Sequence, residues 1–333
     1  MSGLTLYRKY RKHKAIAWSD LKVLIESPTR FAQYKFEKDD KARHKSSGYS
    51  VGDLVDCLVY EPDELWKRFV LKPDDMVEPS SSPNKKKFYA LMKTEEGTPS
   101  NWYKQSYAES GWKKLSDLQV KEKAATLQNE LAPYSLVDNA KDRGLSVISD
   151  AELTLAKIMI NSLKTDKLIN RILFQRDKWD IAEDQFPIIG HLDVPDGTIL
   201  AKCLLDSLRV SFKNKSIYVG DLKTTRRAIG EFNRDYFAFG YHAQLGFYGL
   251  MAMKYLIAKK IVKDPNDWKI YLINFVVQNV PYYESVIFEM TEETMDKAIL
   301  RVHGAIKRYI HHRDKDEWKQ IMEASSNRGM IPI

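Results

Sequence analysis

Hydrophobic and polar positions change their spacing along this chain, and each change predicts an element. Residues from about 15 to 62 repeat their apolar positions at helical spacing and predict three helices. Further on, short apolar or alternating runs separated by turn residues predict strands. These runs cover about residues 185–194, 198–210, 216–223, 269–278 and 283–289. A helix over about residues 237–256 separates the third and fourth strands, and helices follow to about residue 324. The order predicts an α/β fold.

The third predicted strand ends in a carboxylate and an ammonium group. Asp221 and Lys223 are two residues apart, so they lie on the same face of a strand. The preceding strand carries Asp206, and the polar segment 211–216 predicts a hairpin turn. A turn centred between residues 213 and 214 places Asp206 directly opposite Asp221. Two converging carboxylates repel each other unless a cation neutralises them, so the pattern indicates a divalent metal.

The helix that follows carries polar and aromatic residues on one face. Gln244 and Tyr248 are four residues apart and Tyr241 lies three before Gln244, so all three share that face. One interpretation is an aromatic stripe that packs the helix on the sheet, which fits Phe247 best. Gln244 has no such core role, and it indicates a functional face instead.

Together these residues resemble the PD-(D/E)xK nuclease superfamily. Its pattern is an acid, then a second acid two residues before a lysine, here Asp206 and the Asp-Leu-Lys of residues 221–223. The proline of the superfamily's name is replaced here by Leu205. The Gln-x-x-x-Tyr helix resembles the exonuclease branch, which includes the RecB nuclease domain and the phage RecE and lambda-type exonucleases. The resemblance implies a mixed central sheet flanked by helices, preceded by a helical N-terminal region and an insertion.

The resemblance also implies a metal site and its ligands. Asp206, Asp221 and the carbonyl of Leu222 would hold Mg²⁺, or Mn²⁺, one or two ions in number. The helix over residues 48–62 resembles the superfamily's first motif and places Asp56 where a histidine often stands. An aspartate there is a hard oxygen ligand suited to these ions. We therefore predict Asp56 as the third acid of the metal site.

Catalytic roles follow from the same resemblance. Lys223 would orient the attacking water or stabilise the transition state. Gln244 and Tyr248, with Tyr241, would position that lysine or the phosphate. Two further residues, Arg226 and Arg227, come within a turn of Lys223, where they are predicted to contact DNA phosphates.

The N-terminal helices are predicted to bind the DNA end. Ser19 stands at the start of a predicted helix, where it can cap the free amide groups, and the chain resembles the opening of RecE-like proteins here. In that resemblance a serine at the helix start, with nearby basic residues such as Arg30, faces the 5′-phosphate. The alternative interpretation is that Ser19 is only a helix cap.

Composition limits the class of protein. With 44% hydrophobic residues the 333-residue chain can form a sizeable core, and no apolar run is long enough for a membrane span. The two cysteines, Cys57 and Cys203, lie in apolar runs and are predicted to be buried thiols in a reducing cytoplasm. We predict one nuclease domain over residues 1–333, with a loop and helical insertion at about 65–150 and the catalytic core at about 150–333.

The net charge of +8 is consistent with a polyanionic partner. The resemblance makes that partner DNA, and the activity a 5′→3′ exonuclease on linear duplex ends for recombination in a phage-infected host. Such enzymes form homo-oligomeric rings and work with a single-strand annealing protein. Two alternatives stay open: an endonuclease or single-strand exonuclease, and a non-catalytic DNA-binding recombination accessory protein.

Overall fold

The computed structural model describes residues 10–36, 51–74, 76, 78–79, 82–94, 96–109 and 112–318 of the chain. Residue contacts divide it into two compact units. The first unit is Met1–Ser47 with Ile158–Ile333, and the second is Gly48–Lys157. The prediction of a single domain with an insertion from about residue 65 to 150 stays a prediction. Within the described residues, no helix combines the length and the apolar character that a membrane span requires.

The first unit is built on a five-stranded mixed sheet with the order β3-β4-β5-β6-β7. The strands are β3 (Ile181–Val194), β4 (Gly197–Ser211), β5 (Ser216–Thr225), β6 (Lys269–Gln278) and β7 (Ser285–Glu289). Neighbouring strands are antiparallel except β5 and β6, which are parallel. All five predicted strands are confirmed, with end shifts of a few residues.

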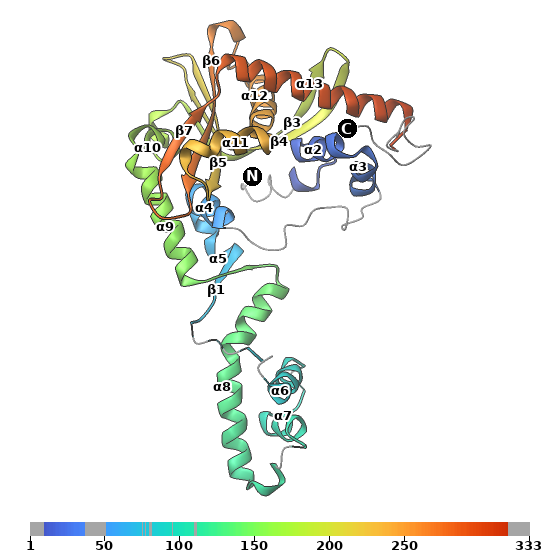
Figure 1. Ribbon diagram of the computed structural model, residues 1–333, viewed down its shortest axis with the longest axis vertical. Helices are drawn as coiled ribbons and strands as arrows, with labels where there is room; N and C mark the ends of the chain where they lie inside the picture. Colours follow the sequence, from blue (N-terminus) through green and yellow to red (C-terminus); the bar gives the residue numbers. More distant parts are fainter. Residues whose placement is uncertain are drawn as a thin grey trace. The chain divides into compact units, whose positions relative to one another are not determined.

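Helices cover this sheet and complete an α/β architecture (Figure 1). The N-terminal pair is α2 (Trp18–Glu26) and α3 (Pro28–Lys35), and the connection between β5 and β6 contains α11 (Phe232–Ala238) and α12 (Tyr241–Ala258). Helix α13 (Glu292–Lys315) follows β7, while α9 (Asp150–Thr165) and α10 (Lys167–Leu173) precede β3. The rest of the C-terminal helical segment predicted to residue 324 lies outside the described residues from 319 onward.

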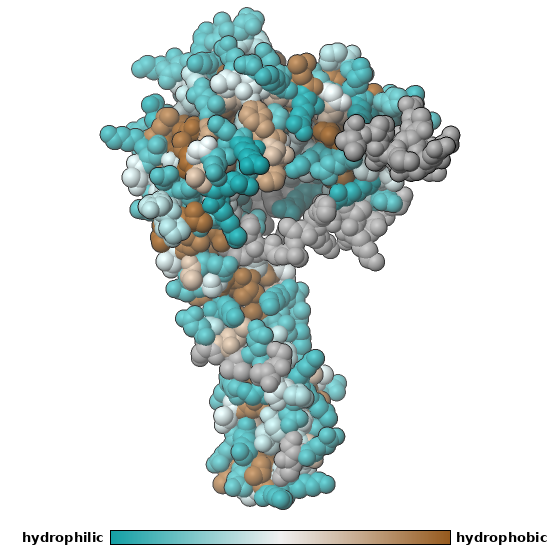
Figure 2. Space-filling view, in the orientation of Figure 1, coloured by the Kyte–Doolittle hydropathy of each residue, from teal (hydrophilic) through white to brown (hydrophobic). Residues whose placement is uncertain are grey.

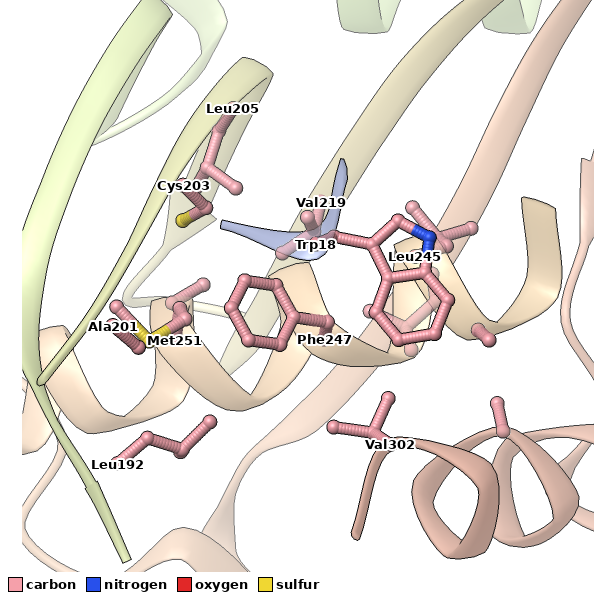
Figure 3. Close-up of a cluster of buried hydrophobic side chains, with 14 of the residues drawn as sticks. Trp18, Leu192, Ala201, Cys203, Leu205, Val219, Leu245, Phe247, Met251 and Val302 are labelled. Atoms are coloured by element: carbon pink, nitrogen blue, oxygen red, sulfur yellow. The ribbon is translucent and has the colours of Figure 1, made fainter. Parts of the chain in front are cut away.

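One hydrophobic core joins the sheet to α2, α12 and α13. Phe247 of α12 is fully buried and packs its ring 6.2 Å from that of Trp18, beside Ala201 and Cys203 of β4 (Figure 3). Phe247 therefore has the packing role that the sequence allowed for it. Both Cys57 and Cys203 are buried free thiols, as predicted.

The second unit is mainly helical. It contains α4 (Val51–Tyr60), α5 (Leu65–Arg68), α6 (Pro83–Lys93), α7 (Pro99–Ser106) and α8 (Asp117–Asp142), with a small parallel pair formed by β1 (Phe69–Leu71) and β2 (Ser146–Ile148). Helices α6, α7 and α8 share an aromatic core around Phe88 and Trp102. Figure 2 shows a largely hydrophilic face over these three helices. The aromatic residues of this segment therefore pack under its helices.

The helix predicted over residues 237–256 is interrupted. Gly240 adopts a left-handed backbone, with φ at 70°, and separates α11 from α12. Glycine takes this conformation without steric cost, so the chain can turn here and start a new helix. Because of this turn, α12 begins at Tyr241, the first of the predicted functional residues on that helix.

Gly220, immediately before Asp221, has no room for a side chain. An added Cβ would lie 2.4 Å from both a ring carbon of the buried Phe275 and the hydroxyl of Ser207. We expect Gly220→Ala to lower the free energy of unfolding by about 3 kcal/mol, because overpacking forces neighbours from their rotamers. Urea denaturation measures this change. Gly190→Ala on β3 is the matched control, since nothing lies within 4 Å of its added Cβ. Equal stability of the two variants would contradict the close packing at Gly220.

Candidate active site

The β4–β5 hairpin brings the two predicted carboxylates together. The register runs from Ser211 opposite Ser216 to Ser207 opposite Gly220, around a four-residue turn. One residue further along the same register, Asp206 faces Asp221. The backbone N–H of Leu222 donates to Asp206 Oδ2 at 3.0 Å, which fixes the carboxylate beside β5. The register predicted from the polar turn is therefore confirmed.

Asp221 lies at the centre of a hydrogen-bonded cluster and is only 3% exposed. Lys223 Nζ lies 2.7 Å from Asp221 Oδ2, so the two side chains share a face of β5 as expected. Asn274, its partner on β6, donates from Nδ2 to the same oxygen at 2.7 Å. Gln244 of α12 donates to Asp221 Oδ1 at 3.3 Å. Three neighbouring side chains thus orient the Asp221 carboxylate.

The two carboxylates interact electrostatically. Burial, and then the charge of Asp221, raise the pKa of Asp206 to about 7, while the Lys223 ammonium acts in the other direction. Like charges at this separation disfavour full ionisation of both groups. A pair of carboxylates in which one resists ionisation is an arrangement that a bound cation stabilises.

Two contacts to the acids were not found from the sequence. Gln185 on β3 donates to Asp206 Oδ1 at 3.4 Å, and its backbone has a φ of 45°. A non-glycine residue held in this left-handed region is strained, and such strain is common at functional sites. The second is Asn274, described above. In the sequence, each of these residues was marked only by being polar within a predicted strand. Gln185 follows two acidic residues, and Asn274 interrupts an apolar run.

A buried ion pair braces the strand beside Gln185. Arg209 on β4 is fully buried and its guanidinium donates to Asp184 Oδ1 at 2.6 Å. The same guanidinium donates to the backbone carbonyls of Ile172, Leu173 and Glu183. A buried charge with every donor paired resists movement, because separating it from its partners leaves it unsatisfied. Through Glu183 and Asp184, this ion pair ties down the two residues of β3 that precede Gln185.

The face of α12 that was predicted to be functional points at this cluster. Gln244 Nε2 donates to the Tyr248 hydroxyl at 2.9 Å as well as to Asp221. Burial, with the charges of Asp221 and Asp206, raises the pKa of Tyr248 well above its ordinary value, so the phenol stays protonated. The Tyr241 ring lies 5.1 Å from Lys223 Nζ, within the range of a cation–π contact. The structure thus groups Asp206, Asp221, Lys223, Gln244, Tyr248 and Tyr241.

A pocket of about 190 Å³ opens beside this cluster. Tyr241, Gln244 and Tyr248 line one side, and Ser19 and Lys22 of α2 line another, with Lys202 of β4 and Phe239 completing the wall. Ser19 is not the helix cap that the sequence predicted: the N-cap is Ala17, whose N–H donates to Asp20 Oδ2 at 2.9 Å. Asp20, not Ser19, satisfies the free amide because its carboxylate folds back over the helix start. The exposed Ser19 hydroxyl faces the pocket region instead.

The remaining predicted residues lie outside the cluster. Arg30 forms an ion pair with Glu26 at 3.4 Å and is absent from the residues lining the pocket. Arg226 and Arg227 follow the end of β5, and Arg227 pairs with Asp235 at 3.0 Å. Asp56 lies on α4 of the second unit, whose placement against the sheet is not defined, so its role as a ligand stays a prediction.

The residues present fit a hydrated magnesium ion. In the described part of the chain, no group of three or more histidine, cysteine, aspartate or glutamate side chains is arranged to hold a metal. Two carboxylates do converge, with the Leu222 backbone between them. Mg²⁺ is commonly bound by one or two carboxylates while water and substrate phosphate fill the other positions. The donor set of Asp206 and Asp221 therefore suits Mg²⁺ or Mn²⁺ better than an ion that needs an all-protein cage.

Comparison with solved structures finds a likeness at low sequence identity. No protein-family profile matches the sequence, and no curated protein matches it. A crystal structure named "Putative exonuclease", from Eubacterium rectale, aligns over 100% of this chain and 95% of its own, with 12% identity and a TM-score of 0.46. At this level of similarity the likeness carries no argument, so the assignment of the site rests on the geometry of the chain itself.

Proposed function

We propose that the chain is a Mg²⁺-dependent deoxyribonuclease with a PD-(D/E)xK-type core. The observation that carries the proposal is the convergence of Asp206 and Asp221 on neighbouring strands, with Lys223 2.7 Å from Asp221. Paired carboxylates beside a lysine are the groups that metal-assisted phosphodiester hydrolysis requires. The mixed sheet and the Gln244 helix, which donates to Asp221, support the proposal.

The residues of the site would have two roles, metal binding and stabilisation of developing charge. Asp206 and Asp221 hold the divalent ion, with the Leu222 carbonyl and Asp56 as further proposed ligands. When bound, the ion supplies Lewis-acid polarisation of the scissile phosphate and a water of lowered pKa. The Lys223 ammonium donates hydrogen bonds to the attacking water or to a phosphate oxygen, and stabilises the charge that develops there.

Gln244 and Tyr248 act through their neighbours. Gln244 holds Asp221 and Tyr248 at once, and the protonated Tyr248 phenol excludes a third negative charge from the cluster. Tyr241 limits the positions open to Lys223 by contact with its ammonium. These contacts keep the lysine directed at the carboxylates before DNA binds, which lowers the cost of reaching the reactive geometry.

We propose further that the substrate is a linear duplex end degraded in the 5′→3′ direction. This part rests on the resemblance, as do the annealing partner, the ring assembly and the cytoplasmic setting of a phage-infected host. The pocket beside the cluster supports only an anionic ligand in general, because Lys22 and Lys202 line it next to Gln244 and Tyr248. Arg226 and Arg227 are proposed to hold the backbone beyond the site.

A substrate panel tests the proposed function. Linear duplex, closed circular duplex and single-stranded DNA are incubated with the full chain in Mg²⁺ and in EDTA. The proposal predicts release of nucleotides from linear duplex in Mg²⁺ and no release in EDTA. Cleavage of closed circles would identify an endonuclease, and preference for single strands would identify a single-strand exonuclease. DNA binding without hydrolysis in either Mg²⁺ or Mn²⁺ would identify an accessory protein.

Ser19 provides a prediction about the DNA end. Linear duplex with a 5′-phosphate should be degraded about tenfold faster than duplex with a 5′-hydroxyl, because a terminal phosphate can accept hydrogen bonds from the Ser19 hydroxyl and the Lys22 ammonium. Ser19→Ala should reduce that preference without changing the rate on 5′-hydroxyl ends. Initial rates on the two substrates measure the effect.

A substitution of Arg30 tests whether its guanidinium also contacts the terminal phosphate. The guanidinium pairs with Glu26 and does not line the pocket, so it reaches a phosphate only if that pair opens. Loss of the preference in Arg30→Ala would show that it does. Equal rates of the wild type on both ends would leave Ser19 with no role in end recognition, and attack from 3′ ends would contradict the proposed polarity.

A further inference from the structure

The turn between β6 and β7 presents an exposed aromatic ring. We call residues 279–284 the Tyr282 turn. Tyr282 is 91% exposed, more than any other large hydrophobic side chain in the described part of the chain. Exposed aromatic rings are a common means of stacking on nucleic-acid bases. The position of this ring is the first reason to expect a ligand.

The backbone of the turn is strained. Tyr282 has a φ of 87° and Tyr283 a φ of 47°, two consecutive left-handed residues that both carry bulky side chains. Glycine would take these conformations without steric cost, whereas an aromatic residue there is a clear outlier. Strained backbone of this kind clusters at functional sites, so the turn is a candidate for one.

The turn is held rigidly despite its exposure. The Gln278 N–H donates to the Glu284 carbonyl at 2.9 Å, and the Glu284 N–H donates back to Gln278 Oε1 at 3.3 Å. Inside the turn the Tyr283 N–H donates to the Val280 carbonyl at 3.0 Å. Pro281 restricts the backbone immediately before Tyr282. These contacts hold the backbone that carries Tyr282, so little backbone entropy is lost when a ligand stacks on its ring.

The same edge of the sheet carries an uncompensated positive charge. The Asn279 N–H donates to the Thr225 carbonyl at 2.9 Å, and Gln278 Nε2 donates to the Arg227 carbonyl at 2.8 Å, so the turn abuts the segment that ends β5. Arg226 lies in that segment, is exposed, and has no ion-pair partner among the residues that the structure describes. Lys223, two residues before Thr225, is part of the candidate active site. The turn therefore stands just beyond the site along the strand direction.

We propose that the Tyr282 turn is a stacking platform for a base of single-stranded DNA, with Arg226 binding the adjacent phosphate. The inference rests on the proposed function, and it specifies that this edge of the sheet binds single-stranded DNA. An exposed ring can stack only on a base that is not already paired and stacked in a duplex. The platform would thus hold the single strand that lies next to the hydrolytic site, whatever its sequence.

Binding measured in EDTA tests the platform without hydrolysis. Fluorescent oligothymidylate is titrated with the full chain, and its dissociation constant is compared among variants. Tyr282→Ala should weaken binding roughly tenfold, since one base stack is worth about 1–3 kcal/mol. Tyr282→Trp should bind as well as the wild type or better. Phe212→Ala is the matched control, because Phe212 is a 50% exposed aromatic in the turn at the other end of β5.

Tyr282→Gly separates the strain from the contact. Glycine relieves the left-handed backbone, so the melting temperature should hold or rise while the affinity for DNA falls about as much as in Tyr282→Ala. An oligonucleotide with one abasic residue, moved stepwise along the strand, should lose affinity at one position for the wild type and at none for Tyr282→Gly. In Arg226→Gln, the slope of the logarithm of the binding constant against the logarithm of the salt concentration should fall by about 1, the value for one lost phosphate contact.

The outcomes separate this inference from the proposed nuclease. Unchanged affinity in both Tyr282→Ala and Tyr282→Gly, or absence of single-strand binding by the wild type, would overturn the platform even if the chain hydrolyses DNA. Loss of affinity in both variants supports the platform even if the wild type shows no hydrolysis in Mg²⁺.

Discussion

Asp221→Asn is expected to slow Mg²⁺-dependent DNA hydrolysis by about 10³-fold or more, and Lys223→Ala by about 10²- to 10³-fold. Asp221 is the carboxylate on which Asn274, Gln244 and Lys223 all converge, so an amide there loses the negative charge that attracts the metal and forms the ion pair with the Lys223 ammonium. Removing Lys223 leaves the carboxylates in place but takes away the donor for water or phosphate. Initial rates of nucleotide release from linear duplex measure both effects.

The chain offers a matched control for these two substitutions. Lys215 and Asp267 form an exposed ion pair at 2.8 Å near the start of β5, far along the strand from the site. Asp267→Asn and Lys215→Ala remove the same charges and should leave the rate unchanged, since exposed pairs contribute little to stability. Melting temperatures in EDTA should stay near the wild-type value for the two control variants, and should hold or rise in Asp221→Asn, because one of two repelling carboxylate charges is removed. Wild-type turnover in Asp221→Asn would contradict the assignment of the site.

Asp206→Asn is expected to change how the stability of the metal-free protein depends on pH. The folded protein raises the pKa of Asp206 from its ordinary 3.8 to about 7, so the folded state holds this proton more tightly than the unfolded state does. Stability from this group is therefore full below about pH 4 and is lost as the pH rises toward 7. The loss above pH 7 should be about 2–4 kcal/mol, and the asparagine variant should not show it.

Urea denaturation in EDTA across this pH range measures the difference between the two proteins. The wild type should be the less stable of the two above pH 7, and the gap should close as the pH falls toward 4. Because the other titrating groups are common to both proteins, the difference isolates the pair formed by Asp206 and Asp221. Saturating Mg²⁺ should restore wild-type stability at pH 7 and above but help Asp206→Asn much less. A gap that widens at low pH would show that the Asp206 carboxylate is stabilised, not destabilised, by folding.

Local patterns explain what the sequence predicted correctly. The Asp206–Asp221 pairing followed from the polar turn and the two-residue period of strands, and the Asp221–Lys223 contact followed from the same period. Gln244 and Tyr248 followed from the four-residue spacing of a helix face. In each case the two residues are joined by one hairpin, one strand or one helix, so their geometry depends on short-range rules that the sequence contains.

Long-range contacts and backbone exceptions were not predictable in the same way. Asn274 reaches Asp221 through a parallel pairing of strands that lie 53 positions apart in the sequence, and nothing local marks that pairing. The left-handed backbone of Gln185 follows directly after Asp184, which pairs with buried Arg209 on another strand, and no local pattern marks it. The helix start is capped by the Asp20 carboxylate, which accepts from the Ala17 N–H, and not by Ser19. The preference for serine, threonine, aspartate and asparagine at the N-cap position does not distinguish the two.

The most direct test of the site is the location of a bound metal in a crystal of the full chain grown with Mn²⁺ and a DNA end. Anomalous scattering at the manganese edge identifies the ion independently of any activity assay. The account predicts a peak about 2.0–2.3 Å from carboxylate oxygens of both Asp206 and Asp221, with a DNA phosphate oxygen in the same coordination sphere. A fully occupied manganese peak elsewhere in the chain, with no ion between Asp206 and Asp221, would contradict it.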